Sequence, residues 1–94
     1  MDLEKNFQQV RERLIKAREE LRIVEEQLLY QMDVLEEAKT RMLVAETPLA
    51  DRDYRVARED HDRLQKQRDE ASAVITELQA EQDRLLDRLL ASRP

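Results

Sequence analysis

One histidine is the residue of this chain best suited to acid–base or metal chemistry. His61 stands beside Glu59, Asp60 and Asp62, and an imidazole among carboxylates can act as a pH-sensitive group. A metal site on a helix would also need a carboxylate three or four residues from the histidine. Those positions hold Ala57, Arg58, Leu64 and Gln65. We therefore expect a partly buried imidazole in the core, with a pH-sensitive layer as the alternative, and no bound metal.

Two polar residues, Gln31 and Arg68, fall at helix positions that are otherwise mostly apolar. Together they could line a ligand pocket. A single buried polar layer, however, commonly fixes the register of a coiled coil. We favour a polar core layer in which the two side chains satisfy each other, and we expect that leucine at both positions would raise the melting temperature.

Three arginines spaced three apart, Arg52, Arg55 and Arg58, form a short basic patch in which Asp51 and Asp53 interleave. The pattern is typical of an exposed, charge-balanced helix start. The whole chain has 17 basic and 22 acidic residues, a net charge of -5, whereas sequence-independent nucleic-acid binding needs a positive field. We expect no direct contact with nucleic acid.

The composition excludes several classes of protein. Among 94 residues there is no glycine, no cysteine and one histidine, so a phosphate-binding loop, a disulfide framework and a cysteine nucleophile are ruled out. A turn that needs a positive φ would also lack its preferred residue. We predict a protein that is not an enzyme, with no cofactor and no small-molecule substrate.

No apolar run approaches the roughly 20 residues that cross a bilayer, and the first residues lack the basic and apolar regions of a secretion signal. We expect no membrane span and a cytoplasmic location. Arginine outnumbers lysine 13 to 4, a bias that suggests a bacterial, GC-rich genome.

Pro48 is the one internal proline and divides two segments rich in Leu, Glu, Gln, Arg and Ala, which favour helices. Thr47 and Pro48 form a plausible N-cap and first helical residue, and Asp51 is a competing cap. We predict one domain over 1–94, with a helix over about 3–46, a turn over about 47–50 and a second helix over about 51–92.

Each segment carries its own heptad repeat. In the first, the a and d positions are almost all apolar and the f positions are all polar, the pattern of a helix that packs along one stripe. The a positions are Phe7, Leu14, Leu21, Leu28, Leu35, Met42 and Leu49, and the d positions are Leu3, Val10, Ala17, Val24, Gln31, Ala38 and Ala45. In the second segment, a falls on Tyr54, His61, Arg68, Ile75, Gln82 and Leu89, and d on Ala57, Leu64, Ala71, Leu78, Leu85 and Ser92.

The two repeats are out of phase across residues 47 to 51, which disfavours one continuous helix. We predict an all-α fold, an antiparallel coiled-coil helical hairpin that dimerises into a four-helix bundle. Folding the chain at residues 49 and 50 places Gln31 in the same layer as Arg68 and Ala38 beside His61.

The first segment has more apolar residues than one stripe can use. A helix that is apolar on several sides is normally covered by more than one neighbour. We therefore expect a partner or oligomer interface at Ile15, Ile23, Leu29, Tyr30, Met32, Val34, Leu43 and Val44. The bend, with Leu43, Val44 and Leu49 near it, is a second candidate for binding.

These features favour a non-enzymatic protein–protein interaction module, a scaffold or adaptor that binds itself, as a homodimer, or another protein. The alternative is a regulator that sequesters a sigma factor or another RNA polymerase component. Some anti-sigma factors of this shape bind cyclic di-GMP through Glu-x3-Ser-x2-Arg-x3-Gln-x3-Asp. Here the best window reads Glu25, Leu29, Met32, Glu36 and Thr40, so only the glutamate matches and no ligand residue carries over.

Overall fold

The chain folds into two long helices. The structure is a computed structural model, and it describes residues 2–93. Helix α1 spans Leu3–Ala45 and helix α2 spans Pro48–Ala91. Both are built from residues with high helix propensity, and proline stands only at the first position of α2 and at the C-terminus, so nothing interrupts either helix. The predicted all-α helical hairpin is confirmed for the described part of the chain.

The turn between the helices is formed by Glu46 and Thr47. Glu46 has a φ of 52°, in the left-handed region, and its N–H donates to the carbonyl of Met42 at 3.3 Å. This bond closes α1 with an αL cap. The expectation that a glycine-free chain avoids such a turn is therefore wrong: a glutamate adopts the conformation that usually favours glycine.

Thr47 starts α2 as its N-cap. Its hydroxyl oxygen accepts from the N–H of Ala50 at 3.2 Å, which satisfies one of the free donors of the first turn, and Pro48 follows at the first helical position. Of the two predicted caps, Thr47 with Pro48 is confirmed, and Asp51 lies within the first turn. The predicted helix start at about 51 was three residues too late.

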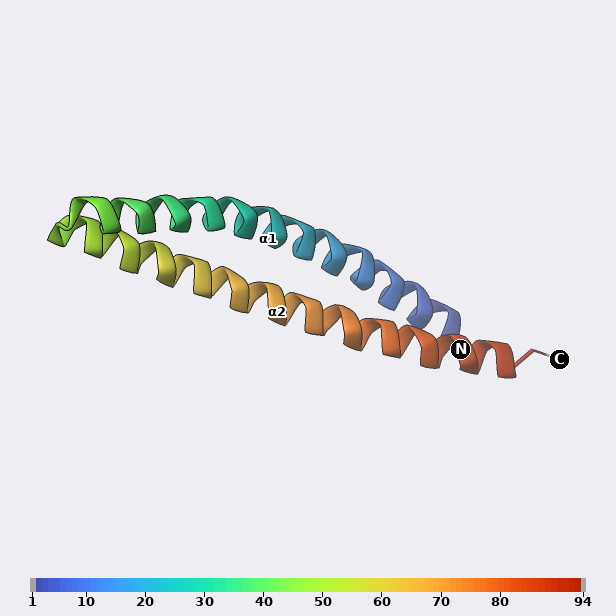
Figure 1. The fold of residues 1–94 in the computed structure, drawn as a ribbon. Helices are drawn as coiled ribbons and strands as arrows, with labels where there is room; N and C mark the ends of the chain where they lie inside the picture. The colour runs from blue at the N-terminus through green and yellow to red at the C-terminus, as the bar shows by residue number, and fades with distance from the viewer. Residues whose placement is uncertain (1, 94) are drawn as a thin grey trace. The chain divides into compact units, whose positions relative to one another are not determined.

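The contacts of the chain divide it into two compact units. Unit 1 contains Met1–Leu21 and Glu70–Pro94, and unit 2 contains Arg22–Asp69, including the turn. In each unit a segment of α1 runs antiparallel to a segment of α2 (Figure 1).

Unit 1 has a continuous apolar core. Five residues form its buried cluster, and Leu14 is the most enclosed of them with 2% of its surface exposed. The cluster consists of Val10, Leu14, Ala17, Leu78 and Leu85, with Leu3, Phe7 and Ile75 packed against it. All eight occupy predicted a or d positions, so the heptad pattern locates this core correctly.

The core of unit 2 is built from smaller residues. Leu28 is buried there together with three alanines, Ala38, Ala50 and Ala57. Most of the remaining predicted a and d positions hold half-buried side chains, among them Val24, Leu35, Met42, Tyr54 and Leu64, whereas Ala45 and Leu49 are exposed. Alanine leaves little side-chain area to bury, so unit 2 gains less from its internal seam than unit 1 does.

Within the described residues, neither helix contains a stretch that is both long enough and apolar enough to cross a membrane.

Candidate interaction surfaces

The predicted pairing of Gln31 with Arg68 is wrong. The Gln31 side-chain amide donates instead to the backbone carbonyl of Ala57 at 3.2 Å. Ala57 precedes Arg68 by eleven residues, about 16 Å along a helix. The cause is the turn: it lies about three residues earlier than expected, and this shifts the pairing of α2 along α1 by about one heptad.

Arg68 forms hydrogen bonds with its neighbour in the sequence, Asp69. Its guanidinium donates to the carboxylate of the adjacent Asp69, from Nε at 3.2 Å and from Nη2 at 2.9 Å. The arginine is half-buried, so its stem covers the seam while its head reaches water. Gln31 and Arg68 are therefore two separate polar interruptions of the seam rather than one polar layer.

His61 lies at a half-buried seam position, and 19% of its side chain is exposed. Its Nδ1 is 3.3 Å from an oxygen of the neighbouring Asp62. A carboxylate one residue away can hold the ring in one orientation. Among residues 2–93, no three His, Asp or Glu side chains gather so that they could hold a metal ion. The pH-sensitive layer stays a prediction.

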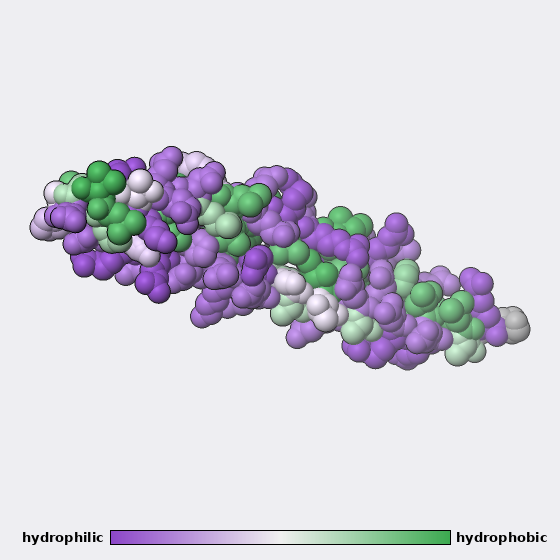
Figure 2. All heavy atoms as spheres, in the orientation of Figure 1, coloured by the Kyte–Doolittle hydropathy of each residue, from purple (hydrophilic) through white to green (hydrophobic). Residues whose placement is uncertain are grey.

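Of the eight residues predicted to form an interface, seven are exposed and Val34 is half-buried. Most belong to unit 2. Tyr30 and Val44 are the most exposed, at 72% and 79%. Figure 2 shows green, apolar atoms on the outer surface at the end where the turn lies, between purple, polar atoms. Large apolar side chains grouped on an outer face mark interaction surfaces more often than single ones do.

These residues form two rows on α1, one on either side of the seam. We call the row of Ile23, Tyr30, Val34 and Val44 the Tyr30 row, because spacings of seven, four and ten residues keep it on one side of the helix. The Leu29 row consists of Leu29, Met32 and Leu43 in unit 2. Ile15, the remaining predicted residue, is 58% exposed and lies in unit 1.

The Tyr30 row borders a groove of unit 2 that sequence reasoning missed. Helix α1 lines it with Val34, Ala38 and Arg41. Helix α2 lines it with Leu49, Arg52, Asp53, Val56, Ala57 and Asp60. Two exposed aliphatic side chains of α2, Leu49 and Val56, thus continue the apolar surface of the Tyr30 row.

Leu49 was assigned to the seam of the first helix, and this assignment is wrong. The early turn makes Leu49 the second residue of α2, where 66% of its surface is exposed, while the next residue, Ala50, is buried. Val56 lies seven residues after Leu49 and so shares its face. The seven-residue spacing from Leu49 was the signal that could have identified Val56 as part of the same surface.

The arginines near the turn are exposed, as expected for a solvated helix start. Arg52 lines the groove together with Asp53 and Asp60, so both charges are present there. The carboxylate of Asp60 also pairs with Arg63 at 2.5 Å. This mixture suits the polar rim of a protein contact better than an anion-binding site.

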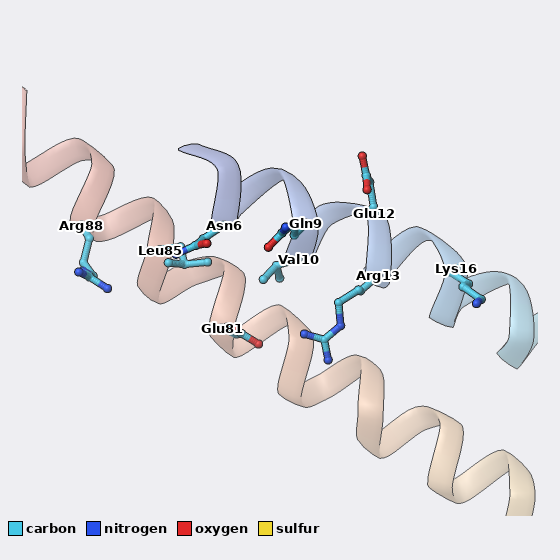
Figure 3. A pocket seen from close by; sticks show the side chains of 9 residues that line it. All are labelled: Asn6, Gln9, Val10, Glu12, Arg13, Lys16, Glu81, Leu85 and Arg88. Carbon is cyan, nitrogen blue, oxygen red and sulfur yellow. The ribbon is translucent and has the colours of Figure 1, made fainter. Parts of the chain in front are cut away.

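A second groove lies in unit 1 (Figure 3). Val10 and Leu85, both buried, point toward each other between the helices. Charged and polar side chains surround them: Asn6, Gln9, Glu12, Arg13, Lys16, Glu81 and Arg88. Because basic and acidic groups alternate around this groove, it offers no site of one sign of charge.

The fold and these surfaces define a class, the all-α helical hairpins with apolar outer faces. Comparison of the chain with protein families, with curated proteins and with solved structures finds no match.

Proposed function

We propose that this protein is a non-enzymatic interaction module, a coiled-coil scaffold or adaptor that associates with itself and presents its outer helix faces to another protein. The contact would use the Tyr30 row and the Leu29 row of α1 as aliphatic and aromatic anchors. The charged residues around them would form the rim.

The observation that carries the proposal is the large surface that the hairpin leaves exposed, together with the large apolar side chains that lie on it. A chain of 11.2 kDa with a compact monomeric fold exposes about 5,700 Å², whereas this hairpin exposes 7377 Å². The surplus is about twice the area of about 800 Å² that each partner buries in a standard interface. Burial of part of it against a second chain would be favourable in proportion to its apolar area.

The proposal is tested by the solution mass, measured by light scattering over a concentration range of about a hundredfold. We expect a mass of two chains that falls toward one chain on dilution. The variant Tyr30→Glu is expected to weaken association, whereas Lys66→Glu, at an exposed position off both rows, serves as a control.

A monomer at every concentration would contradict self-association. It would leave the outer faces free and favour the alternative, a regulator that sequesters a sigma factor through the same faces. Pull-down with the tagged protein from the native organism, compared with Tyr30→Glu, then separates the two hypotheses, because only capture that depends on the row supports helix-face binding.

A further inference from the structure

We propose that two copies of the chain pack antiparallel through one stripe of α1, with a two-fold axis near residue 39. We call it the Val stripe; it consists of Val34, Glu37, Arg41 and Val44. In this arrangement each Val34 faces Val44 of the second copy, and each Glu37 faces Arg41 of the second copy. The inference rests on the proposed self-association and specifies its surface and direction.

The four residues share one face of α1. Their spacings of three, four and three residues are those of a coiled-coil seam. The carboxylate of Glu37 lies 3.9 Å from Nη1 of Arg41 on this face. Val34 and Arg41 both line the groove of unit 2. The stripe is therefore a second seam, beside the one that packs against α2.

The order of residue types selects the direction of packing. Along the chain the stripe consists of valine, glutamate, arginine and valine. When two copies run antiparallel, each valine lies opposite a valine and each glutamate lies opposite an arginine. An antiparallel pair thus forms two valine contacts and two ion pairs. A parallel pair would instead set Glu37 against Glu37 and Arg41 against Arg41, and like charges at an interface oppose association.

The surroundings of the stripe extend the contact. Tyr30, one turn before Val34, falls beside Pro48 and Leu49 of the second copy in this alignment, at its turn. Tyrosine is enriched among residues that anchor interfaces. Val56 of α2 borders the same groove and adds apolar area. The contact uses residues of unit 2 only.

The Leu29 row does not offer an equivalent surface, although Met32, Glu36, Lys39 and Leu43 repeat the same order of types. The difference lies in α2. The positions that flank its seam on that side are mostly charged, among them Asp51, Arg55, Arg58 and Asp62, whereas the exposed Leu49 and Val56 line the groove beside the Val stripe. A contact through that face would bury these charged groups instead of aliphatic side chains, and because burying a charge is costly unless it is paired, that face is disfavoured.

Charge reversal tests the surface. We expect Glu37→Arg and Arg41→Glu each to weaken the dimer by about a hundredfold in Kd, because each change creates two like-charge contacts. The double variant Glu37→Arg/Arg41→Glu restores both pairs and is expected to recover dimerisation to within about tenfold of the natural chain. The matched control is Glu36→Arg, the same change of charge one residue away, which should leave Kd within about threefold.

Cysteine crosslinking tests the direction, since the chain contains no cysteine of its own. A mixture of Val34→Cys and Val44→Cys is expected to form disulfide-linked dimers of one chain of each kind. Each variant alone should not crosslink, because its two cysteines lie ten residues apart along the antiparallel pair, beyond the reach of a disulfide.

The outcomes separate this inference from the proposed function. If the natural chain dimerises but Val44→Cys links to itself, or Glu36→Arg disrupts the dimer and Glu37→Arg does not, the Val stripe is refuted while self-association stands. If the natural chain is a monomer at all concentrations, both fail. Circular dichroism of each variant establishes that the helices remain folded.

Discussion

Units 1 and 2 share the same heptad pattern, but different residue types fill their seam positions. In unit 1 the seam holds mainly large apolar residues, with Gln82 as a half-buried polar exception, and five residues form one buried cluster. In unit 2 three of the four buried residues are alanines, and Gln31, His61 and Arg68 stand at seam positions. The large apolar residues of unit 2 lie mostly outside.

This difference teaches how a two-helix protein can divide stability and binding. Apolar area that faces inward stabilises the hairpin, and apolar area that faces outward is available to a second chain. Of the twelve large exposed apolar residues among residues 2–93, eight fall within Arg22–Asp69, from Ile23 to Val56. Unit 1 therefore contains the larger apolar core, and unit 2 carries most of the exposed apolar surface that the proposed self-association would use.

The largest expected effect comes from the core of unit 1. We expect Leu14→Ala to lower the free energy of unfolding by about 3–4 kcal/mol, because the side chain is enclosed by other buried residues and leaves a cavity. Leu28→Ala, in the alanine-rich seam of unit 2, should cost about 2 kcal/mol. Urea denaturation followed by circular dichroism measures both. Equal costs would break the distinction between the two units.

The polar seam of unit 2 provides the next test. Replacing both Gln31 and Arg68 by leucine is expected to raise the free energy of unfolding by about 2 kcal/mol, because the seam then resembles that of unit 1. Since the two side chains occupy separate layers, the effects of the single variants should add. A coupling energy above about 0.5 kcal/mol in the double-mutant cycle would instead indicate that they interact.

The cap of α2 is expected to contribute less. Thr47→Ala removes the acceptor of the Ala50 N–H and should lower the free energy of unfolding by about 1 kcal/mol. Thr76→Ala is the matched control, because that exposed hydroxyl donates only to the carbonyl of Ser72 within the helix. Its effect should stay within about 0.5 kcal/mol. An equal loss in both variants would refute the role of the cap.

The smallest expected effect concerns the left-handed residue of the turn. Glu46→Gly should raise the free energy of unfolding by about 0.5–1 kcal/mol, because glycine reaches a φ of 52° without the steric cost of a Cβ. Glu36→Gly, within α1, is the control and should lower it by about 1 kcal/mol. Thermal denaturation of both variants shows whether each substitution raises or lowers the stability. Destabilisation by Glu46→Gly would contradict the assigned turn.

The exposure of the outer apolar residues of α1 could be predicted from the sequence to a large extent, whereas their use as an interface stays a prediction. The excess of apolar residues in the first segment identified the outer rows of α1, because seven of those eight residues are exposed. Val56 was missed. Leu49 was named at the bend as a candidate for binding, but an error of a few residues in the turn assigned it to the wrong helix. The partner of Gln31 was missed for the same reason.

The sequence by itself determined that the chain forms two helices and which stripe of each faces inward, because both follow from local propensity and from a repeat that any single helix carries. The tertiary structure alone decided the register. A heptad repeat looks the same after a shift of seven residues, so the apolar pattern accepts several alignments equally well. The choice among them was made by the backbone of the turn, where one glutamate in the left-handed region and one threonine cap fix how far α2 lies along α1.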